Sequence, residues 1–206
     1  MTVDYSLFDE MNVSRETFER LSTYVELVKR WNPKINLVSR KSLEHIWNRH
    51  ILDSVQVYRC AGSFETWADF GSGGGFPGMV CAIIAAEENS TSSFTMVESD
   101  QRKSAFLRSV ARECGIKCSV ISKRIETVDP MAANIVSARA LADLNTLLSF
   151  CDRHLAECGM ALLPKGANWK KELADACEEW NFEAEPITSL TEPQAVILKI
   201  KGVSRG

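Results

Sequence analysis

A glycine-rich turn between a strand-like segment and a helix constrains the fold of this chain more than any other feature. Residues 67–70 are mostly apolar, four glycines follow within residues 71–75, and the apolar stretch 79–86 begins just after Pro77. Proline is favoured in the first turn of a helix, so the segment reads as strand, turn and helix. Because glycine lacks a Cβ atom, backbone N–H groups in this turn can approach a ligand closely. We therefore expect a ligand-binding loop and not a flexible surface loop.

The residues around the turn narrow the class of ligand. A phosphate-binding P-loop closes with Lys and Ser or Thr, whereas this turn closes with Phe-Pro-Gly at 76–78. The dinucleotide pattern G-x-G-x-x-G fits Gly73, Gly75 and Gly78, so an NAD-dependent enzyme remains an alternative. Asp69 completes the pattern D-x-G-x-G-x-G, which is similar to the first motif of methyltransferases that use S-adenosylmethionine (SAM).

Composition limits the remaining classes of protein. The chain has 206 residues, 45% of them apolar and 25% charged, which suits one globular domain with an extension. We see no apolar leader or long apolar run, so we expect a cytoplasmic protein without a membrane span. The seven cysteines include no C-x-x-C pair, and we expect neither disulfides nor a metal site. A net charge of −3 means that any RNA binding must come from local basic patches.

Residues 1–60 form the expected extension, and it is helical. Ser14 can cap a first helix that stops at Asn32-Pro33, and apolar residues at helical spacing predict a second helix from about Ser42 to Tyr58. The connector, residues 29–41, carries five basic residues and one aromatic residue but no acid. This composition fits a face that contacts RNA, and it fits a solvated basic connector equally well.

Residues 61–206 alternate strands with helices, as in a parallel sheet that helices cover on both sides. The expected strands are residues 66–70, 94–98, 119–122, 134–138, 159–163, 183–190 and 195–201, and the expected helices are 79–86, 101–114, 144–155 and 170–180. Only a short turn separates the last two strands, so they must pair antiparallel. An antiparallel hairpin at the end of a parallel sheet favours a class I methyltransferase over a plain dinucleotide-binding fold.

Polar residues follow several of the predicted strands at the edge where an open α/β sheet binds its ligand. Glu98 follows the second strand and could accept hydrogen bonds from both ribose hydroxyls. Ile125 and Glu126 follow the third strand, where an adenine ring would lie. Arg139 and Lys165 follow the fourth and fifth strands and direct two cations at the site, which suits an anionic substrate.

Five segments together resemble the RsmG family, also called GidB, of bacterial 16S ribosomal RNA methyltransferases. These segments are residues 31–37, 49–54, 71–78, 137–140 and 164–166. The resemblance implies a class I SAM-dependent methyltransferase fold, Rossmann-like, with a mainly parallel seven-stranded sheet whose last strand is antiparallel. It also implies methyl transfer from SAM to N7 of a guanine in 16S rRNA, at position 527 in the 530 loop.

The resemblance also assigns roles to individual residues. By motif position, the SAM contacts of the family correspond to Gly71, Phe76, Ile125, Glu126 and Arg139, and the glycine turn and strand-end acid add three more. These three are Gly73, Gly75 and Glu98. The resemblance places His50, Asp53 and Ser54 near the mouth of the cofactor site, where they could position the substrate or only pack the second helix on the sheet.

The expected chemistry needs few catalytic groups. Guanine N7 has an in-plane lone pair and no proton, so its attack on a methyl sulfonium requires alignment and neither a general base nor a metal ion. The expected partners are 16S rRNA or the small ribosomal subunit, and we expect a monomer. Another RNA, a small molecule, an NAD-dependent oxidoreductase or a non-catalytic nucleotide-binding module remain alternatives at this point.

Overall fold

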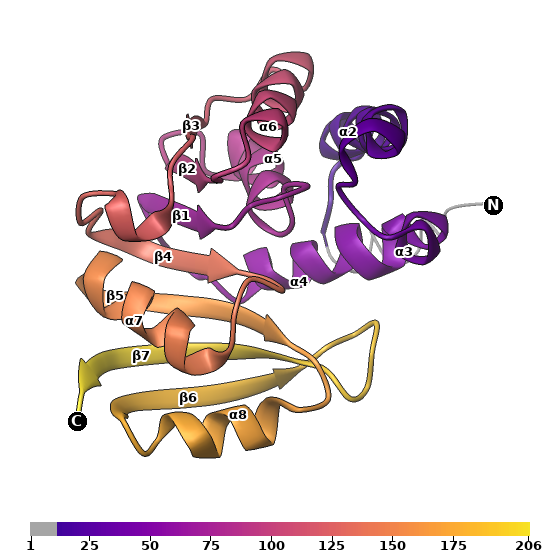
Figure 1. The fold of residues 1–206 in the computed structure, drawn as a ribbon. Coiled ribbons are helices and arrows are strands. Elements are labelled where there is room, and N and C mark those ends of the chain that lie inside the picture. The colour runs from indigo at the N-terminus through magenta and orange to yellow at the C-terminus, as the bar shows by residue number, and fades with distance from the viewer. Residues whose placement is uncertain (1–11) are drawn as a thin grey trace.

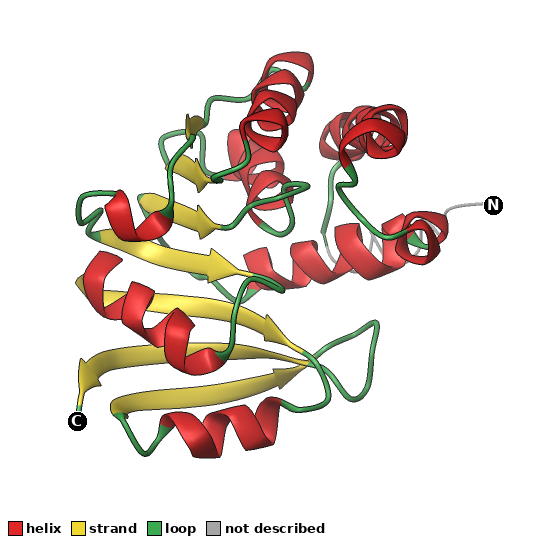
Figure 2. Ribbon diagram, viewed as in Figure 1, coloured by secondary structure: helices red, strands yellow, loops and turns green. Residues whose placement is uncertain are grey.

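Seven strands form one sheet in the order β3-β2-β1-β4-β5-β7-β6, and helices cover both of its faces (Figures 1 and 2). The computed structural model describes residues 12–206. Its strands are β1 (Thr66–Phe70), β2 (Ser93–Val97), β3 (Ser119–Ile121), β4 (Ala133–Ala138), β5 (Leu155–Lys165), β6 (Trp180–Thr188) and β7 (Val196–Arg205). Its helices are α2 (Arg15–Ile35), α3 (Arg40–Glu44), η1 (Trp47–Leu52), α4 (Asp53–Arg59), α5 (Gly78–Glu88), α6 (Gln101–Glu113), η2 (Ile125–Thr127), α7 (Leu144–His154) and α8 (Trp169–Ala176).

The direction of the strands confirms the predicted fold class. Strands β1 to β5 pair in parallel, and β7 pairs antiparallel with both β5 and β6. Only residues 189–195 join β6 to β7, and so short a connection can make only a hairpin. The sheet is therefore mainly parallel with a reversed last strand.

Successive side chains of the strands point to opposite faces, so the sheet separates two apolar cores. Trp67, Met96 and Ile135 lie in the core under α2, α4, α5 and α6. Ala68 and Val136, their neighbours along the chain, lie in the core under α7 and α8. Burial on both faces explains why the central strands are almost continuously apolar.

The first helix does not stop at Asn32-Pro33 as predicted, because α2 continues to Ile35. Pro33 lacks the N–H that would bond to the carbonyl of Lys29, but both residues are exposed and water can satisfy that carbonyl. The helix ends one turn later, where Asn36 adopts the left-handed conformation and the side chain of Asn32 accepts hydrogen bonds from the backbone of residues 37 and 38. Thus Asn32 organises the end of the helix from inside it.

The second predicted helix is three segments and not one. Ser39 caps α3 three residues earlier than expected, and a six-residue π-helix, η1, separates α3 from α4. A π-helix contains one extra residue per turn, so it rotates the side chains that follow relative to a regular helix, and hydrophobic spacing does not reveal it. A further difference concerns α8, which ends at Ala176 and not at Trp180. Trp180 instead starts β6 and pairs with Arg205.

The helical extension packs against the glycine turn. Tyr24 of α2 is fully buried, its hydroxyl donates a hydrogen bond to the carbonyl of Gly74, and its ring lies against Phe76. A Cβ atom on Gly75 would lie 2.6 Å from the Tyr24 oxygen, so the turn closes on this helix without room for a side chain. Residues 1–11, which belong to the predicted extension, lie outside the described residues.

We predict that Tyr24→Phe destabilises the protein by about 1–3 kcal/mol, since it leaves the buried carbonyl of Gly74 without its donor. Urea unfolding measures this loss. Tyr58→Phe is the matched control: this ring is also buried, and its hydroxyl makes no hydrogen bond among residues 12–206. Equal effects of the two substitutions would contradict a role for the Tyr24 hydroxyl in holding the turn.

Candidate cofactor and substrate sites

The glycine turn uses its glycines for two different purposes. Gly71, Gly73 and Gly75 have φ angles of 58°, 52° and 94°, which other residues rarely adopt. Gly71 and Gly73 line a cavity, whereas Gly75 packs against Tyr24 and Met79. The turn is thus open toward the ends of the strands and closed toward the helices.

Glu98 holds the open side of the turn in place. One carboxylate oxygen accepts a hydrogen bond from the N–H of Gly73, and the other accepts one from the N–H of Asp100, both at 2.8 Å. Asp100 in turn caps the first turn of α6. Glu98 is 7% exposed, so its carboxylate is a fixed acceptor at the carboxyl end of β2.

A cavity of about 380 Å³, here called the Glu98 cavity, lies over the carboxyl ends of β1, β2 and β4. It is within the size range of small-molecule sites, roughly 300–1,000 Å³. The lining residues include five that the sequence predicts: Gly71, Gly73, Glu98, Ile125 and Glu126. Gly75, Phe76 and Arg139, also predicted to bind the cofactor, are not among them.

Sequence reasoning missed part of this lining. The cavity is also lined by Leu141 of the loop between β4 and α7, by Thr146 and Phe150 of α7, and by Lys103 of α6. Leu141 is exposed, and a Cβ atom on Gly71 would lie 2.5 Å from its side chain, so Leu141 covers the turn. The helices were predicted, but no spacing in the sequence shows which helix face turns toward the ends of the strands.

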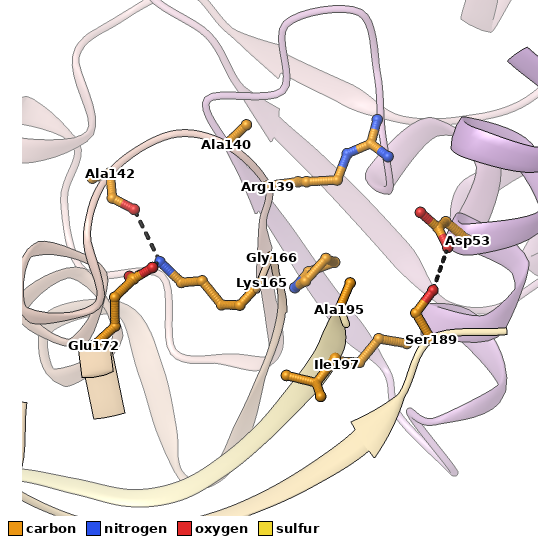
Figure 3. A pocket seen from close by; sticks show the side chains of 12 residues that line it. Asp53, Arg139, Ala140, Ala142, Lys165, Gly166, Glu172, Ser189, Ala195 and Ile197 are labelled. Atoms are coloured by element: carbon orange, nitrogen blue, oxygen red, sulfur yellow. Dashed lines mark hydrogen bonds and ion pairs between the residues drawn. The ribbon is translucent and has the colours of Figure 1, made fainter. Parts of the chain in front are cut away.

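Figure 3 shows a second cavity of about 320 Å³, here called the Asp53 cavity. Asp53, Arg139, Lys165, Glu172 and Ser189 are its polar lining residues. Ala140 and Ala142 line both cavities. Ala140 has a φ of 52°, so the chain turns sharply in the wall that the two cavities share.

Arg139, which lines the Asp53 cavity, and its neighbour His50 are both half-buried. The Arg139 guanidinium donates hydrogen bonds to the carbonyl of Arg49, at 3.1 Å, and to Nδ1 of His50, and it lies over the Phe76 ring. Burial and the positive charge of Arg139 lower the pKa of His50 to about 3. His50 is therefore neutral at physiological pH, with its proton on Nε2, so that Nδ1 accepts the hydrogen bond from Arg139.

Two other predicted site residues have local partners. The Ser54 hydroxyl is buried and donates to the carbonyl of His50, four residues earlier, at 2.6 Å. The Lys165 side chain is only 8% exposed, and its ammonium donates to Glu172, at 2.7 Å, and to the carbonyl of Ala142, at 3.0 Å. Lys165 thus lies at the Asp53 cavity, but its charge is neutralised by Glu172.

Asp69, the first residue of the glycine motif, lies in the interior and does not line either cavity. It accepts a hydrogen bond from Ser137 at 2.6 Å, and Ser137 accepts one from the Trp67 indole. Gly78 of α5 approaches so closely that a Cβ atom there would lie 2.5 Å from Asp69. Burial raises the pKa of Asp69 to about 6, although the Ser137 hydroxyl opposes the shift.

This raised pKa predicts a pH dependence of stability. Between about pH 4 and pH 6 the folded state keeps a proton on Asp69 that the unfolded chain loses, so the contribution of Asp69 is fully present at low pH and is lost as the pH rises through 6. In the parent protein the free energy of unfolding should fall by about 3 kcal/mol over this pH range, and Asp69→Asn should remove this decrease. Urea unfolding from pH 4 to pH 7 measures it, with Asp152→Asn on the exposed face of α7 as the control. Parallel curves for the parent and Asp69→Asn would refute the assignment.

Within residues 12–206 no three His, Cys, Asp or Glu side chains come together in a way that could hold a metal ion. Over the same residues no helix is long and apolar enough to cross a bilayer.

The strand order and the reversed strand β7 define the class I methyltransferase fold. A SAM-dependent methyltransferase from Aquifex aeolicus has a similar structure, with a TM-score of 0.59 and 10% sequence identity over 80% of this chain and 100% of that one. A TehB-like SAM-dependent methyltransferase from Corynebacterium glutamicum also has a TM-score of 0.59, with 12% identity over 88% of this chain and 98% of that one. These similarities show the fold.

Sequence comparison then identifies the family. The model described as rRNA small subunit methyltransferase G matches residues 17–199. Ribosomal RNA small subunit methyltransferase G of Ruegeria pomeroyi is 65% identical over 95% of this chain and 96% of its own length. The protein of the same name from Paracoccus denitrificans is 45% identical over 94% of this chain and 98% of its own length. The chain belongs to the rRNA small subunit methyltransferase G family, which confirms the resemblance found in its sequence.

Proposed function

We propose that the protein transfers a methyl group from SAM to N7 of a guanine in the 16S rRNA of the small ribosomal subunit. The observation that carries the proposal is the wall that the two cavities share at Ala140 and Ala142. A methyl donor in the Glu98 cavity and a base in the Asp53 cavity would meet there. Membership of the family supports this substrate, and the reversed strand β7 supports a methyltransferase over an NAD-dependent oxidoreductase.

The Glu98 cavity suits SAM in size and chemistry. Glu98 is placed to accept hydrogen bonds from the ribose hydroxyls, Ile125 would cover the adenine ring, and the N–H groups of the glycine turn would face the amino-acid part. When bound, SAM supplies a methyl group on a cationic sulfur, and as guanine N7 bonds to that carbon the S–C bond breaks and the positive charge passes to the purine ring. The residues of this chain contribute by alignment and by exclusion of water.

Residues around the Asp53 cavity would hold the base. Arg139 is a fixed cation, because its contacts with Arg49, His50 and Phe76 leave it little freedom. Neutral His50 orients it and does not exchange a proton at physiological pH. Lys165, paired with Glu172, fixes the carbonyl of Ala142 in the shared wall. These residues therefore act by positioning, in keeping with a reaction that needs no general base.

Methyl transfer from labelled SAM tests the function directly. The substrates are unmodified small subunits and free 16S rRNA, and the modified base is mapped by the chemical cleavage that occurs at N7-methylguanine. We expect one methyl group per subunit at one guanine, at position 527 in the 530 loop. Label on a different atom or on another RNA would contradict the proposal, and the two substrates together show whether the assembled subunit is required.

Glu98→Gln should weaken SAM binding by about 1.5–3 kcal/mol, because it removes a charged acceptor and places an amide N–H₂ against one of two backbone donors. Calorimetry measures the affinity, and urea unfolding shows how much of the loss comes from a disturbed glycine turn. Glu113→Gln is the control, since Glu113 pairs with Arg112 on the surface of α6. Unchanged SAM affinity in Glu98→Gln would refute the ribose assignment.

The basic connector is the proposed RNA surface. Lys34, Arg40 and Lys41 are exposed at the end of α2 and the start of α3, and none makes an ion pair among the described residues. Lys170 and Lys171, exposed on α8, form a second candidate surface, from which the neutralised Lys165 is excluded. Phosphate contacts would be local, because the whole chain is acidic.

Replacement of Lys34, Arg40 and Lys41 together by Ala should lower RNA affinity and reduce the slope of log K against log salt by about two units, given about 0.7 units per phosphate on single-stranded RNA. Binding titrations at several salt concentrations measure the slope. The control replaces Arg112, Lys117 and Lys201, which are exposed near the opposite edge of the sheet, and changes the net charge equally. If the slope of log K against log salt falls equally in both triple variants, the effect is one of net charge and the connector is only a solvated face.

The protein acts as a monomer in the cytoplasm, with residues 1–60 as the helical extension and 61–206 as the SAM-binding domain. The contact of Tyr24 with the glycine turn supports an extension that works as part of the domain. Sedimentation of the purified protein, alone and with SAM, tests the oligomeric state.

A further inference from the structure

The carboxylate of Asp53 is oriented by two hydroxyl groups from a distant part of the chain. Its Oδ1 accepts hydrogen bonds from Ser189, at 3.1 Å, and from Thr191, both in the turn between β6 and β7. Its Oδ2 has no hydrogen-bond or ion-pair partner among residues 12–206. Asp53 lines the cavity that bears its name, so an aligned carboxylate oxygen is available there (Figure 3).

The position of Asp53 in the cavity matches one edge of guanine. For methylation the N7 atom must face the wall at Ala140 and Ala142, beyond which the cofactor would lie. The N1–H and N2–H₂ donors lie on the other side of the purine ring. Figure 3 shows Asp53 and Ser189 on one side of the cavity and Ala142 with Lys165 and Glu172 on the other. A guanine oriented for methylation would therefore turn its N1 and N2 donors toward Asp53.

We propose that Asp53 is the residue that selects guanine, by accepting hydrogen bonds from N1–H and N2–H₂ of the target base. This inference rests on the proposed function. A carboxylate has only acceptors to offer, so it pairs with the two donors of guanine and repels the N1 acceptor of adenine. Selection of this kind is strong because a mismatched base leaves a charged group without its partner.

The same contact favours the reaction itself. Methylation at N7 moves a positive charge onto the purine ring, and a carboxylate at the opposite edge stabilises that charge more in the transition state than in the ground state. The Arg139 guanidinium and the Asp53 carboxylate also stabilise each other, since Asp53 opposes the lowering of the Arg139 pKa by burial. Glu172, the other carboxylate in the cavity, is paired with Lys165 and cannot take this role.

A substrate with one donor removed tests the inference. Small subunits are assembled with 16S rRNA that carries either guanine or inosine at the target position, and single-turnover methyl transfer is measured with enzyme in excess. Inosine keeps N7 and N1–H but lacks the N2 amino group. We expect the parent enzyme to favour guanine by roughly ten- to a hundredfold, as for one hydrogen bond to a charged acceptor.

Asp53→Asn is the informative variant, because its carbonyl oxygen can still accept from Ser189 and Thr191 while its amide replaces the free oxygen. We expect roughly a hundredfold slower transfer to guanine, a guanine-to-inosine ratio near one, and unchanged SAM affinity by calorimetry. Asp175→Asn, an exposed position on α8, is the control and should keep both the rate and the ratio of the parent.

The outcomes separate the two proposals. The inference is overturned if the parent enzyme does not discriminate between guanine and inosine. It is also overturned if Asp53→Asn slows transfer to both substrates equally or abolishes transfer to both. In either case Asp53 serves only to hold the β6–β7 turn. A lower melting temperature for Asp53→Asn with an unchanged ratio leads to the same conclusion. If the parent enzyme methylates no guanine in the subunit, the proposed function itself fails.

Discussion

The site depends on the glycine turn being held from both sides. Glu98 accepts a hydrogen bond from the N–H of Gly73 on the side of the cavity, and Tyr24 donates one to the carbonyl of Gly74 on the side of the extension. A turn rich in glycine has many backbone conformations available in the unfolded chain, so fixing it on folding costs a large amount of conformational entropy. The buried partners on either side offset that cost and leave Gly71 and Gly73 lining the Glu98 cavity.

The two cations that line the Asp53 cavity have close partners. Arg139 is half-buried against His50 and Phe76, and Lys165 is paired with Glu172. A buried charge without a partner costs several kcal/mol, so these cations need local acceptors, and the same acceptors fix their positions. In the same cavity Oδ2 of Asp53 has no hydrogen-bond partner among residues 12–206, while Lys34, Arg40 and Lys41 are exposed on the connector between α2 and α3. The contacts proposed for the base and for the phosphates are thus on different parts of the molecule.

The reversed strand links the fold class to the substrate side of the site. Because β7 runs antiparallel to β5, the β6–β7 turn lies beside the carboxyl end of β5, where Lys165 pairs with Val196. From this turn Ser189 and Thr191 reach Asp53, and the backbone around residue 190 bonds to Gln56 of α4. The hairpin that distinguishes this sheet from a dinucleotide-binding sheet therefore also positions the helix that carries Asp53.

The sequence by itself determined the order of the strands and helices along the chain, the antiparallel hairpin, the glycine turn and the acid at Glu98. Each of these follows from local rules: strand and helix periodicity, the short 189–195 connection, and the backbone freedom of glycine. The family resemblance was also contained in short segments of sequence. Only the tertiary structure decided that Lys165 is neutralised by Glu172, that Asp69 points into the interior, and that Leu141 covers Gly71. The tertiary structure also decided that η1 is a π-helix and that Ser189 donates a hydrogen bond to Asp53. The physical reason is that the charge and direction of a side chain depend on partners far away in the chain, and Asp53 and Ser189 are 136 residues apart.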